Sequence, residues 1–268
     1  MESLDNQKVS IEVENPKKIL VAVPTMGIDS DPNRWLKSFL NVINDIRSNG
    51  LTHAPLFIHR DHWYPAMNKI FNVAFSHDFD YILRMDDDVW GIGHQHFSKL
   101  YEAQKDVIGA LYPTRYFPYV YAALNRVDNT KDLVEAYREK ENFLTEVKGE
   151  GIQKVDLIGF GMTLIKVEPF KLVPRPLFPE IEECPDDTYF AKICQDNKIE
   201  QYVHMDVKMA HREVTPMNRV HLMNADARMM LANGILKSDP YNKNPFIDKL
   251  VDAFGVDGTK DINKLMSM

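Results

Sequence analysis

Three consecutive aspartates, Asp86, Asp87 and Asp88, stand directly after the mainly apolar run 79–85. Side by side, three carboxylates repel one another, and burying them without a counter-charge costs free energy. A divalent cation that also bridges the phosphates of a nucleotide is a common way to make such a cluster favourable. The triplet therefore predicts a Mg²⁺ or Mn²⁺ site, and the alternative is a solvated acidic turn or a helix N-cap.

Two further groups could do chemistry together with this triplet. Asp186 and Asp187 open a helix that is predicted over 185–197. Carboxylates there complement the helix dipole, so they could simply cap the helix, or one could accept the proton of a sugar hydroxyl as a general base. His211 follows the last predicted strand. A lone histidine is more often structural, but an imidazole readily completes a Mn²⁺ site if the chain returns to the triplet.

The elements that must position these groups alternate between strands and helices. Short apolar runs predict strands at 17–23, 54–59, 81–85, 106–111, 155–166 and 199–207. Apolar residues at helical spacing predict helices between 31 and 50 and at 65–76, 95–104 and 185–197. This alternation indicates an α/β protein with a mainly parallel sheet and helices on both faces. Ligands of such sheets bind outside the carboxyl ends of the strands, where the triplet falls.

Other stretches are less regular and allow two interpretations each. The region 112–155 is predicted to form loops and hairpins, with a short helix around 131–140. Its aromatic residues between Tyr112 and Tyr121 could form an acceptor-binding wall, although aromatic residues more commonly pack in the core. Gly159 and Gly161 mark either a packing kink or a close approach of the backbone to a ligand. Pro24 and Thr25 end the first strand at the same edge as the aspartates, where a plain turn is the alternative.

Composition narrows the class of protein. The 268 residues carry a net charge of −7, with 44% hydrophobic and 26% charged residues, which fits one α/β domain with or without a tail. The acidic balance argues against a broad surface for DNA or anionic lipid. Two cysteines without metal-type spacing indicate the reduced thiols of a cytoplasmic protein. Residues 1–16 are expected to form a polar arm rather than a signal peptide, and no apolar stretch reaches membrane-spanning length.

Taken in order, several segments resemble a known family. They are Pro-Thr after the first strand, Pro-Ala-Met-Asn in the second helix, Tyr-Ile-Leu-Arg-Met-Asp-Asp-Asp-Val, Gly-Phe-Gly-Met-Thr-Leu-Ile-Lys, Asp-Asp-Thr-Tyr-Phe and Asp-Val-Lys-Met-Ala-His. The succession is similar to the GT-A fold nucleotide-sugar glycosyltransferases, in particular the large family 2 of inverting enzymes. The resemblance spans about residues 17–212. It implies a GT-A (Rossmann-like) catalytic domain over 17–212. The segment 213–268 matches no part of the family, and its own pattern predicts a helical extension or lid.

The resemblance also implies roles for individual residues. Asp88 would ligate the divalent metal, with Asp86 and His211 as further ligands. Asp187 would be the catalytic base, and Asp186 its neighbour. The residues expected to bind the donor nucleotide are Pro24, Thr25, Arg60, Asn68, Asp86 and Asp87, and Asp61 could assist Arg60. Two positions depart from the family pattern: Met67 stands where Arg is common, with Arg60, Lys69 or Arg84 as substitutes, and Asp186 stands where Glu is usual.

The implied reaction is an inverting transfer of a sugar from a nucleoside-diphosphate sugar to an acceptor hydroxyl. Mn²⁺ or Mg²⁺ would be the cofactor and a UDP-sugar the favoured donor. The acceptor would be a glycan, a small molecule or a modified nucleic acid. Two alternatives stay open: a non-catalytic sugar-nucleotide or glycan-binding protein of the same fold, and a sugar nucleotidyltransferase. The latter would carry a basic, Gly-rich phosphate loop after the first strand, where this chain has neither Lys nor Arg in 24–29.

Overall fold

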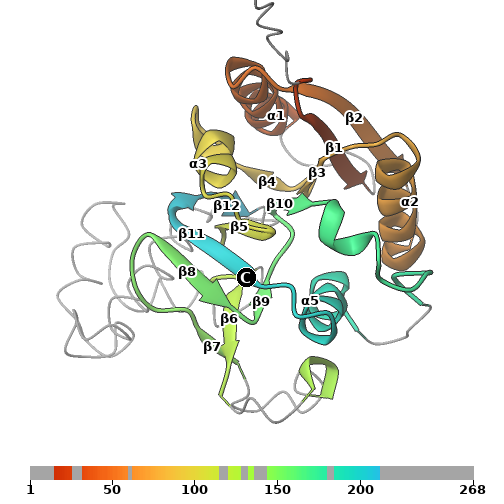
Figure 1. The fold of residues 1–268 in the computed structure, drawn as a ribbon. Helices are drawn as coiled ribbons and strands as arrows, with labels where there is room; N and C mark the ends of the chain where they lie inside the picture. Colours follow the sequence, from red (N-terminus) through yellow and green to blue (C-terminus); the bar gives the residue numbers. More distant parts are fainter. Residues whose placement is uncertain are drawn as a thin grey trace, which may run out of the picture.

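The structure is a computed structural model, and Figure 1 shows its course. It describes residues 15–25, 32–59, 62–114, 120–127, 132–135, 144–179 and 184–211. The N-terminal arm up to residue 14, Arg60, Asp61 and the predicted C-terminal extension lie outside these ranges. The expected domain limits of 17–212 therefore stay predictions.

A seven-stranded sheet forms the centre of the molecule, in the order β2-β1-β3-β10-β5-β11-β8. β1, β2, β3, β5 and β11 run in one direction, whereas β10 and β8 are antiparallel to their neighbours. The mainly parallel α/β sheet flanked by helices, predicted from the alternation of elements, is confirmed. The strands are β1 (Lys18–Thr25), β2 (Thr52–His59), β3 (Tyr81–Met85), β5 (Val107–Leu111), β8 (Ile152–Val155), β10 (Met162–Lys166) and β11 (Gln201–Lys208).

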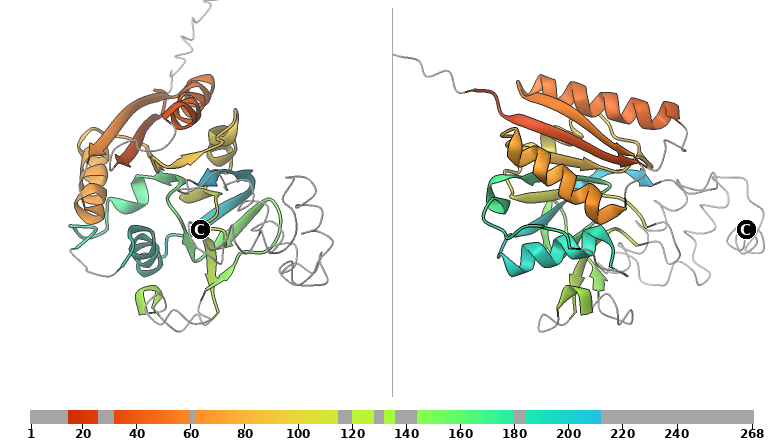
Figure 2. Two further views of the ribbon diagram at one scale, coloured as in Figure 1. Left: turned by 180° about the vertical axis from the view of Figure 1, so that it is seen from behind. Right: turned by 90° about the vertical axis from the view of Figure 1, so that its right-hand side faces the viewer.

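Helices cover both faces of this sheet, as Figures 1 and 2 show. Side chains alternate along a strand, so β1 sends Leu20 and Ala22 into one core cluster and Val21 and Val23 into another. The first cluster lies under α2 (Trp63–Ser76) and α5 (Asp186–Asp196), and includes Phe71 and Phe190. The second lies under α1 (Pro32–Ser48) and α3 (His96–Glu102), and includes Trp35 and Phe97. A short 3-10 helix, η1, spans Glu168–Phe170.

Two small sheets complete the described fold. β4 (Val89–Trp90) pairs antiparallel with β12 (Ala210–His211), and β6 (Ala123–Arg126) lies between β7 (Leu144–Glu146) and β9 (Leu157–Ile158). The pairing of β6 with β7 confirms the expected hairpin character of this region. The strand character predicted at 155–166 is present in β9 and β10, but these two strands belong to different sheets, so the run is interrupted at the two glycines.

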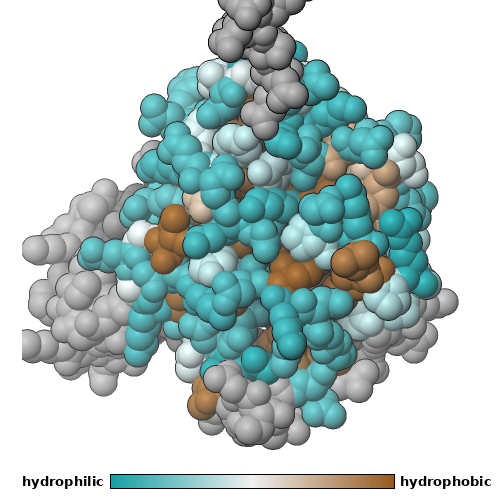
Figure 3. All heavy atoms as spheres, in the orientation of Figure 1, coloured by the Kyte–Doolittle hydropathy of each residue, from teal (hydrophilic) through white to brown (hydrophobic). Residues whose placement is uncertain are grey.

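One face of the described residues is mainly polar. The face in Figure 3 is largely hydrophilic, with hydrophobic residues in small separate groups. Within the described ranges, no helix combines the length and the apolar character that crossing a membrane requires.

Candidate active site

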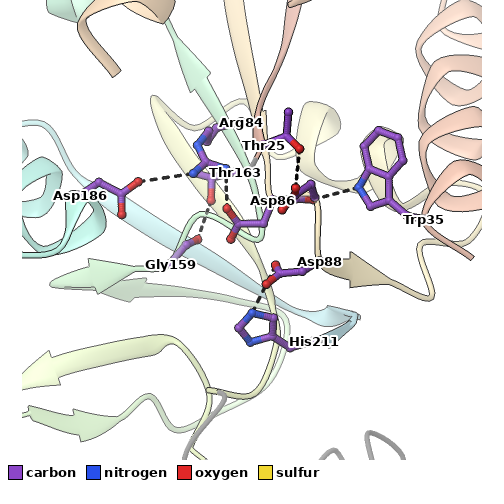
Figure 4. Close-up of polar contacts among 10 residues, drawn as sticks. Thr25, Trp35, Arg84, Asp86, Asp88, Gly159, Thr163, Asp186 and His211 are labelled. Atoms are coloured by element: carbon purple, nitrogen blue, oxygen red, sulfur yellow. Dashed lines mark hydrogen bonds and ion pairs between the residues drawn. The ribbon is translucent and has the colours of Figure 1, made fainter. Parts of the chain in front are cut away.

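The aspartate triplet lies where β3 ends and β4 begins, at the carboxyl edge of the sheet. Backbone contacts fix its position. The backbone N–H of Asp86 donates to the carbonyl oxygen of Gly161 at 3.2 Å. The indole Nε1 of Trp35, from α1, donates to the carbonyl oxygen of Asp86 at 3.1 Å. The triplet is thus held by a strand connection on one side and by a helix on the other (Figure 4).

Each of the three carboxylates contacts a different partner, which limits their mutual repulsion. The contacts are Arg84 Nη1 to Asp86 Oδ1 at 2.6 Å, Thr25 Oγ1 to Asp87 Oδ2 at 2.6 Å, and His211 Nε2 to Asp88 Oδ1 at 3.4 Å. The partners come from β3, β1 and β12, so the triplet joins three strands that are distant in the sequence. Of these contacts, only the one with His211 was expected.

Asp88 and His211 form the part of the site that fits a divalent cation. The β4–β12 pairing sets His211 opposite Val89, next to Asp88. Nδ1 of His211 lies 2.9 Å from the carbonyl oxygen of Pro113, which can only accept a hydrogen bond, so Nδ1 carries a proton. In the neutral ring Nε2 therefore offers its lone pair toward Asp88. A carbonyl that orients the other ring nitrogen is the usual support of a metal-binding histidine.

The donor set is only partly assembled. Within the described ranges, no three His, Cys, Asp or Glu side chains are grouped so that they could hold one ion. Asp88 and His211 supply two donor atoms, while Asp86 is engaged by Arg84. Two protein ligands suit Mg²⁺ or Mn²⁺ nonetheless, because such ions commonly complete their shell with water and substrate phosphates.

The acidic pair opens α5 as predicted. Oδ2 of Asp186 lies 3.4 Å from Nη2 of Arg84, so the same guanidinium contacts the triplet and the pair (Figure 4). Oδ1 of Asp187 accepts hydrogen bonds from the backbone N–H of Thr188 at 2.7 Å and from its hydroxyl at 3.3 Å. The two carboxylates thus have different environments: an arginine beside one, and neutral donors beside the other.

These environments decide which carboxylate holds a proton. Burial raises the pKa of Asp186, although Arg84 opposes the shift. Burial and the neighbouring Asp186 raise the pKa of Asp187 to about 7, against the donors of Thr188. The donors at the N-terminus of α5 favour the ionised form of Asp187, but burial and Asp186 outweigh them, so Asp187 is only partly ionised at neutral pH. A carboxylate with a pKa near 7 suits a general base that works at neutral pH.

The remaining predicted residues have local structural partners. Thr25 and Pro24 end β1 at the edge expected for them, and the Thr25 hydroxyl binds Asp87. The side chain of Asn68 donates to the carbonyl oxygen of Phe178 at 2.6 Å and accepts from its N–H at 3.1 Å. Nucleoside contacts of these three residues stay predictions, and Arg60 lies outside the described residues.

Tyr112 is a site residue that the sequence did not single out as such. Its ring lies edge-on to the His211 ring, with centroids 5.2 Å apart, and it fills the space over Gly159 and Gly161. A Cβ on either glycine would collide with it, so a close packing contact explains both glycines. Tyr112 and Tyr121 are buried, whereas the aromatic residues between 115 and 119 lie outside the described residues.

Arg84 is the second residue that was missed in this role. It was considered only as a substitute contact for the donor, yet it is buried and ion-paired with two carboxylates. The signal was present in the sequence, because a charged side chain inside a buried strand needs a partner nearby.

Comparisons with known proteins end at the level of general structural likeness. No protein-family model matches the sequence, and no curated protein does. The protein A197 from STIV is similar in structure, with 21% identity over 73% of this chain and 86% of that chain, and a TM-score of 0.45. The catalytic domain of Drosophila β1,4-galactosyltransferase 7 in complex with xylobiose shares 15% identity over 76% of this chain and 73% of its own, with a TM-score of 0.44.

A mutant of the same Drosophila enzyme, in complex with manganese, UDP-Gal and xylobiose, gives 15% identity, 77% and 73% coverage and a TM-score of 0.43. At TM-scores below 0.5 these likenesses carry nothing about the activity of this chain, which has to be inferred from its own residues.

Proposed function

We propose that this protein is a metal-dependent glycosyltransferase. It would move a sugar from a nucleoside-diphosphate sugar, with a UDP-sugar as the favoured donor, to an acceptor hydroxyl with inversion. The single observation that carries the proposal is the meeting of three groups at one edge of the sheet. These groups are the aspartate triplet, His211 facing Asp88, and the acidic pair, in which Asp186 contacts Arg84 and Asp187 has a pKa of about 7.

Asp88 and His211 are the residues that would hold the cation. When bound there, a divalent cation would stabilise the negative charge of a departing nucleoside diphosphate. Thr25 and Trp35 support this role, because they fix the triplet from β1 and α1 before any ligand arrives. A site whose side chains are already oriented does not have to reorganise during the reaction.

Asp187 is the residue that would accept the proton of the acceptor hydroxyl. Its pKa near 7 leaves a large fraction ionised at pH 7 to 8, and makes the carboxylate a stronger base than an exposed aspartate. Asp186 keeps its charge more easily beside Arg84, so it is the better candidate for orienting the acceptor. Asp187 would therefore remove the proton, and Asp186 would position the acceptor.

The metal assignment is tested with Asp88→Ala. Wild-type protein should melt at a higher temperature when Mn²⁺ and UDP are added together, because a ligand that binds only the folded state stabilises it. The variant should lose this increase while its melting temperature without ligand changes little. A matched control is Asp206→Ala, an exposed carboxylate on β11. A metal response that survives in Asp88→Ala would overturn the assignment.

The base is tested by comparing Asp187→Asn with Asp186→Asn. Asp187→Asn should keep the Mn²⁺ and UDP response yet lose sugar transfer by about 10²-fold or more, the scale expected for a positioned base. Asp186→Asn should lose less. Transfer is followed as release of nucleoside diphosphate in a panel of nucleotide sugars and acceptors. Equal and small losses in both variants would reduce the acidic pair to a helix cap.

A further inference from the structure

Arg84 connects two groups of carboxylates that belong to different elements. Its guanidinium contacts Asp86, which follows β3, at 2.6 Å and Asp186, which begins α5, at 3.4 Å. It lies over the ring of Phe160, 5.3 Å from the ring centroid, and its side chain is only 5% exposed. We call this set of three residues (Asp86, Arg84 and Asp186) the Arg84 bridge (Figure 4).

The Arg84 bridge contains one positive charge and two negative charges. One buried guanidinium serves two carboxylates, and the shorter contact goes to Asp86. Burial lowers the pKa of Arg84, but Asp86 and Asp186 outweigh burial and raise it, so the cation is secure. Its Nε is buried and has no hydrogen-bond partner among the described residues, so the guanidinium does not use all its donors. The Arg84 guanidinium can therefore strengthen its contact with one carboxylate when its contact with the other weakens.

The two carboxylates of the bridge have different expected duties. Asp86 belongs to the triplet beside Asp88, where a divalent cation would bind, while Asp186 lies beside the candidate base Asp187. A divalent cation near Asp86 would repel the guanidinium and compete with it for the carboxylate, since like charges a few ångströms apart interact strongly in a poorly solvated site. The guanidinium would then turn to the partner that remains, Asp186.

We propose that Arg84 is a positioning residue that couples cation binding at the aspartate triplet to the acidic pair on α5. This inference rests on the proposed function. Arg84 competes with the cation for Asp86, and Asp186 draws Arg84 away, so Asp186 assists cation binding without touching the cation. By thermodynamic reciprocity, the bound cation also strengthens the contact between Arg84 and Asp186. Donor binding would thus fix Asp186 in its acceptor-orienting position before the acceptor arrives.

The coupling predicts a change in Mn²⁺ affinity that is opposite in direction to the change expected from a purely structural role. If Arg84 only held Asp86 in position, its removal would displace Asp86 from the cation site, and Mn²⁺ binding would weaken. If Arg84 competes with the cation, Arg84→Gln should bind Mn²⁺ more tightly. Asp186→Asn should bind Mn²⁺ more weakly in the wild-type background. In the Arg84→Gln background, the same substitution should weaken Mn²⁺ binding much less.

The experiment is a double-mutant cycle on the full chain, with Mn²⁺ alone as the probe. Free Mn²⁺ is measured by its electron paramagnetic resonance signal, which requires no donor sugar and no activity. We expect Arg84→Gln to lower the dissociation constant and Asp186→Asn to raise it, each about 10-fold, within the range for contacting residues in such cycles. In the Arg84→Gln background the effect of Asp186→Asn should fall to about 2-fold.

Two controls separate the bridge from general charge and from unfolding. Asp196→Asn removes a carboxylate from the other end of α5, where it pairs with Lys192, and should leave the Mn²⁺ dissociation constant unchanged. If Arg84→Gln does not fold, Arg84→Lys keeps the charge as a point that cannot serve two carboxylates at once. In that background, Asp186→Asn should likewise lose most of its effect on Mn²⁺.

The outcomes distinguish this inference from the proposed function. Mn²⁺ binding that Asp88→Ala abolishes, together with the predicted signs, supports both. If that binding is present but Arg84→Gln weakens it, or if Asp186→Asn acts equally in both backgrounds, only the coupling is overturned. A wild-type protein that does not bind Mn²⁺ even when UDP is present would overturn the metal-dependent function and the coupling with it.

Discussion

At the scale of single residues, Asp187 differs most from an ordinary aspartate. Its pKa of about 7 in the folded protein lies above the value of 3.8 that an unperturbed aspartate has. Between these two values the folded state binds more protons than the unfolded state, so stability falls as the pH rises toward 7. The carboxylate proposed as the base is therefore a source of instability at the pH where it would work.

Asp187→Asn should consequently stabilise the protein at pH 8 and not at pH 4. The neutral amide removes the cost of an ionised, partly buried carboxylate, which exists only above the unfolded pKa. We expect the melting temperature at pH 8 to rise by roughly 2–4 °C, about 1 kcal/mol for a chain of this size. Thermal unfolding across pH 4 to 8 measures the effect. An increase that is equal at all pH values would contradict the raised pKa.

The control for this series of melting temperatures is an exposed carboxylate. Asp196, in the last turn of α5, forms an exposed pair with Lys192 at 2.7 Å, and exposed pairs of this kind contribute little. Asp196→Asn should therefore change the melting temperature by less than about 1 °C at each pH. A large pH-dependent effect there would point to helix charge in general rather than to Asp187.

At the scale of elements, the contact between Tyr112 and the segment from β9 to β10 depends on glycine. A Cβ on Gly159 would meet the Tyr112 hydroxyl, whereas a Cβ on Gly161 would meet the edge of the ring. Gly159→Ala and Gly161→Ala should each destabilise the protein by about 1–3 kcal/mol through overpacking. Tyr112→Phe removes only the hydroxyl, so it should restore part of the loss in Gly159→Ala and none in Gly161→Ala.

Urea unfolding of the three single variants and the two double variants measures this difference. The result also bears on His211, because the Tyr112 ring supports it edge-on. Equal rescue of both alanine variants by Tyr112→Phe would mean that the tyrosine ring relaxes away, and that its position is not fixed by the glycines.

Asn68 joins α2 to the segment that precedes α5. Its side chain satisfies both the N–H and the carbonyl of Phe178, a buried residue. Asn68→Ala would leave these groups without their partner and should destabilise the protein by about 1–3 kcal/mol. Asn72→Ala, at an exposed position of the same helix, is the matched control and should be nearly neutral. Loss of UDP binding without loss of stability would instead favour the nucleoside role predicted from the sequence.

At the scale of the whole molecule, the sequence predicted those strands and helices that have a clear pattern of apolar residues. β3 agrees with its apolar run from Tyr81 to Met85, because all five of its residues are buried, and α5 begins at the predicted acidic pair. The position of the triplet followed from the strand that it ends. The split between β9 and β10 did not follow, since it depends on the ring of Tyr112, which is distant in sequence.

The sequence predicted the residue types of the candidate site better than the contacts between those residues. The approach of His211 to Asp88 was stated only as a condition, because it depends on the β4–β12 pairing between distant segments. The second contact of Arg84 and the high pKa of Asp187 depend on how deeply the folded chain buries them. Burial of a charged group is a property of the assembled layers, and a local pattern does not contain it.

The edge of the central sheet has a consequence for how the protein behaves at high concentration. β2 is the end strand in the described sheet, eight residues long, and a long end strand is a template to which another chain can add. Pro55 lies in its middle, paired with Val21, and has no N–H to donate. A proline there interrupts the ladder that a neighbouring molecule would need. Along β2, another copy of the chain would therefore meet an interrupted row of hydrogen-bond donors.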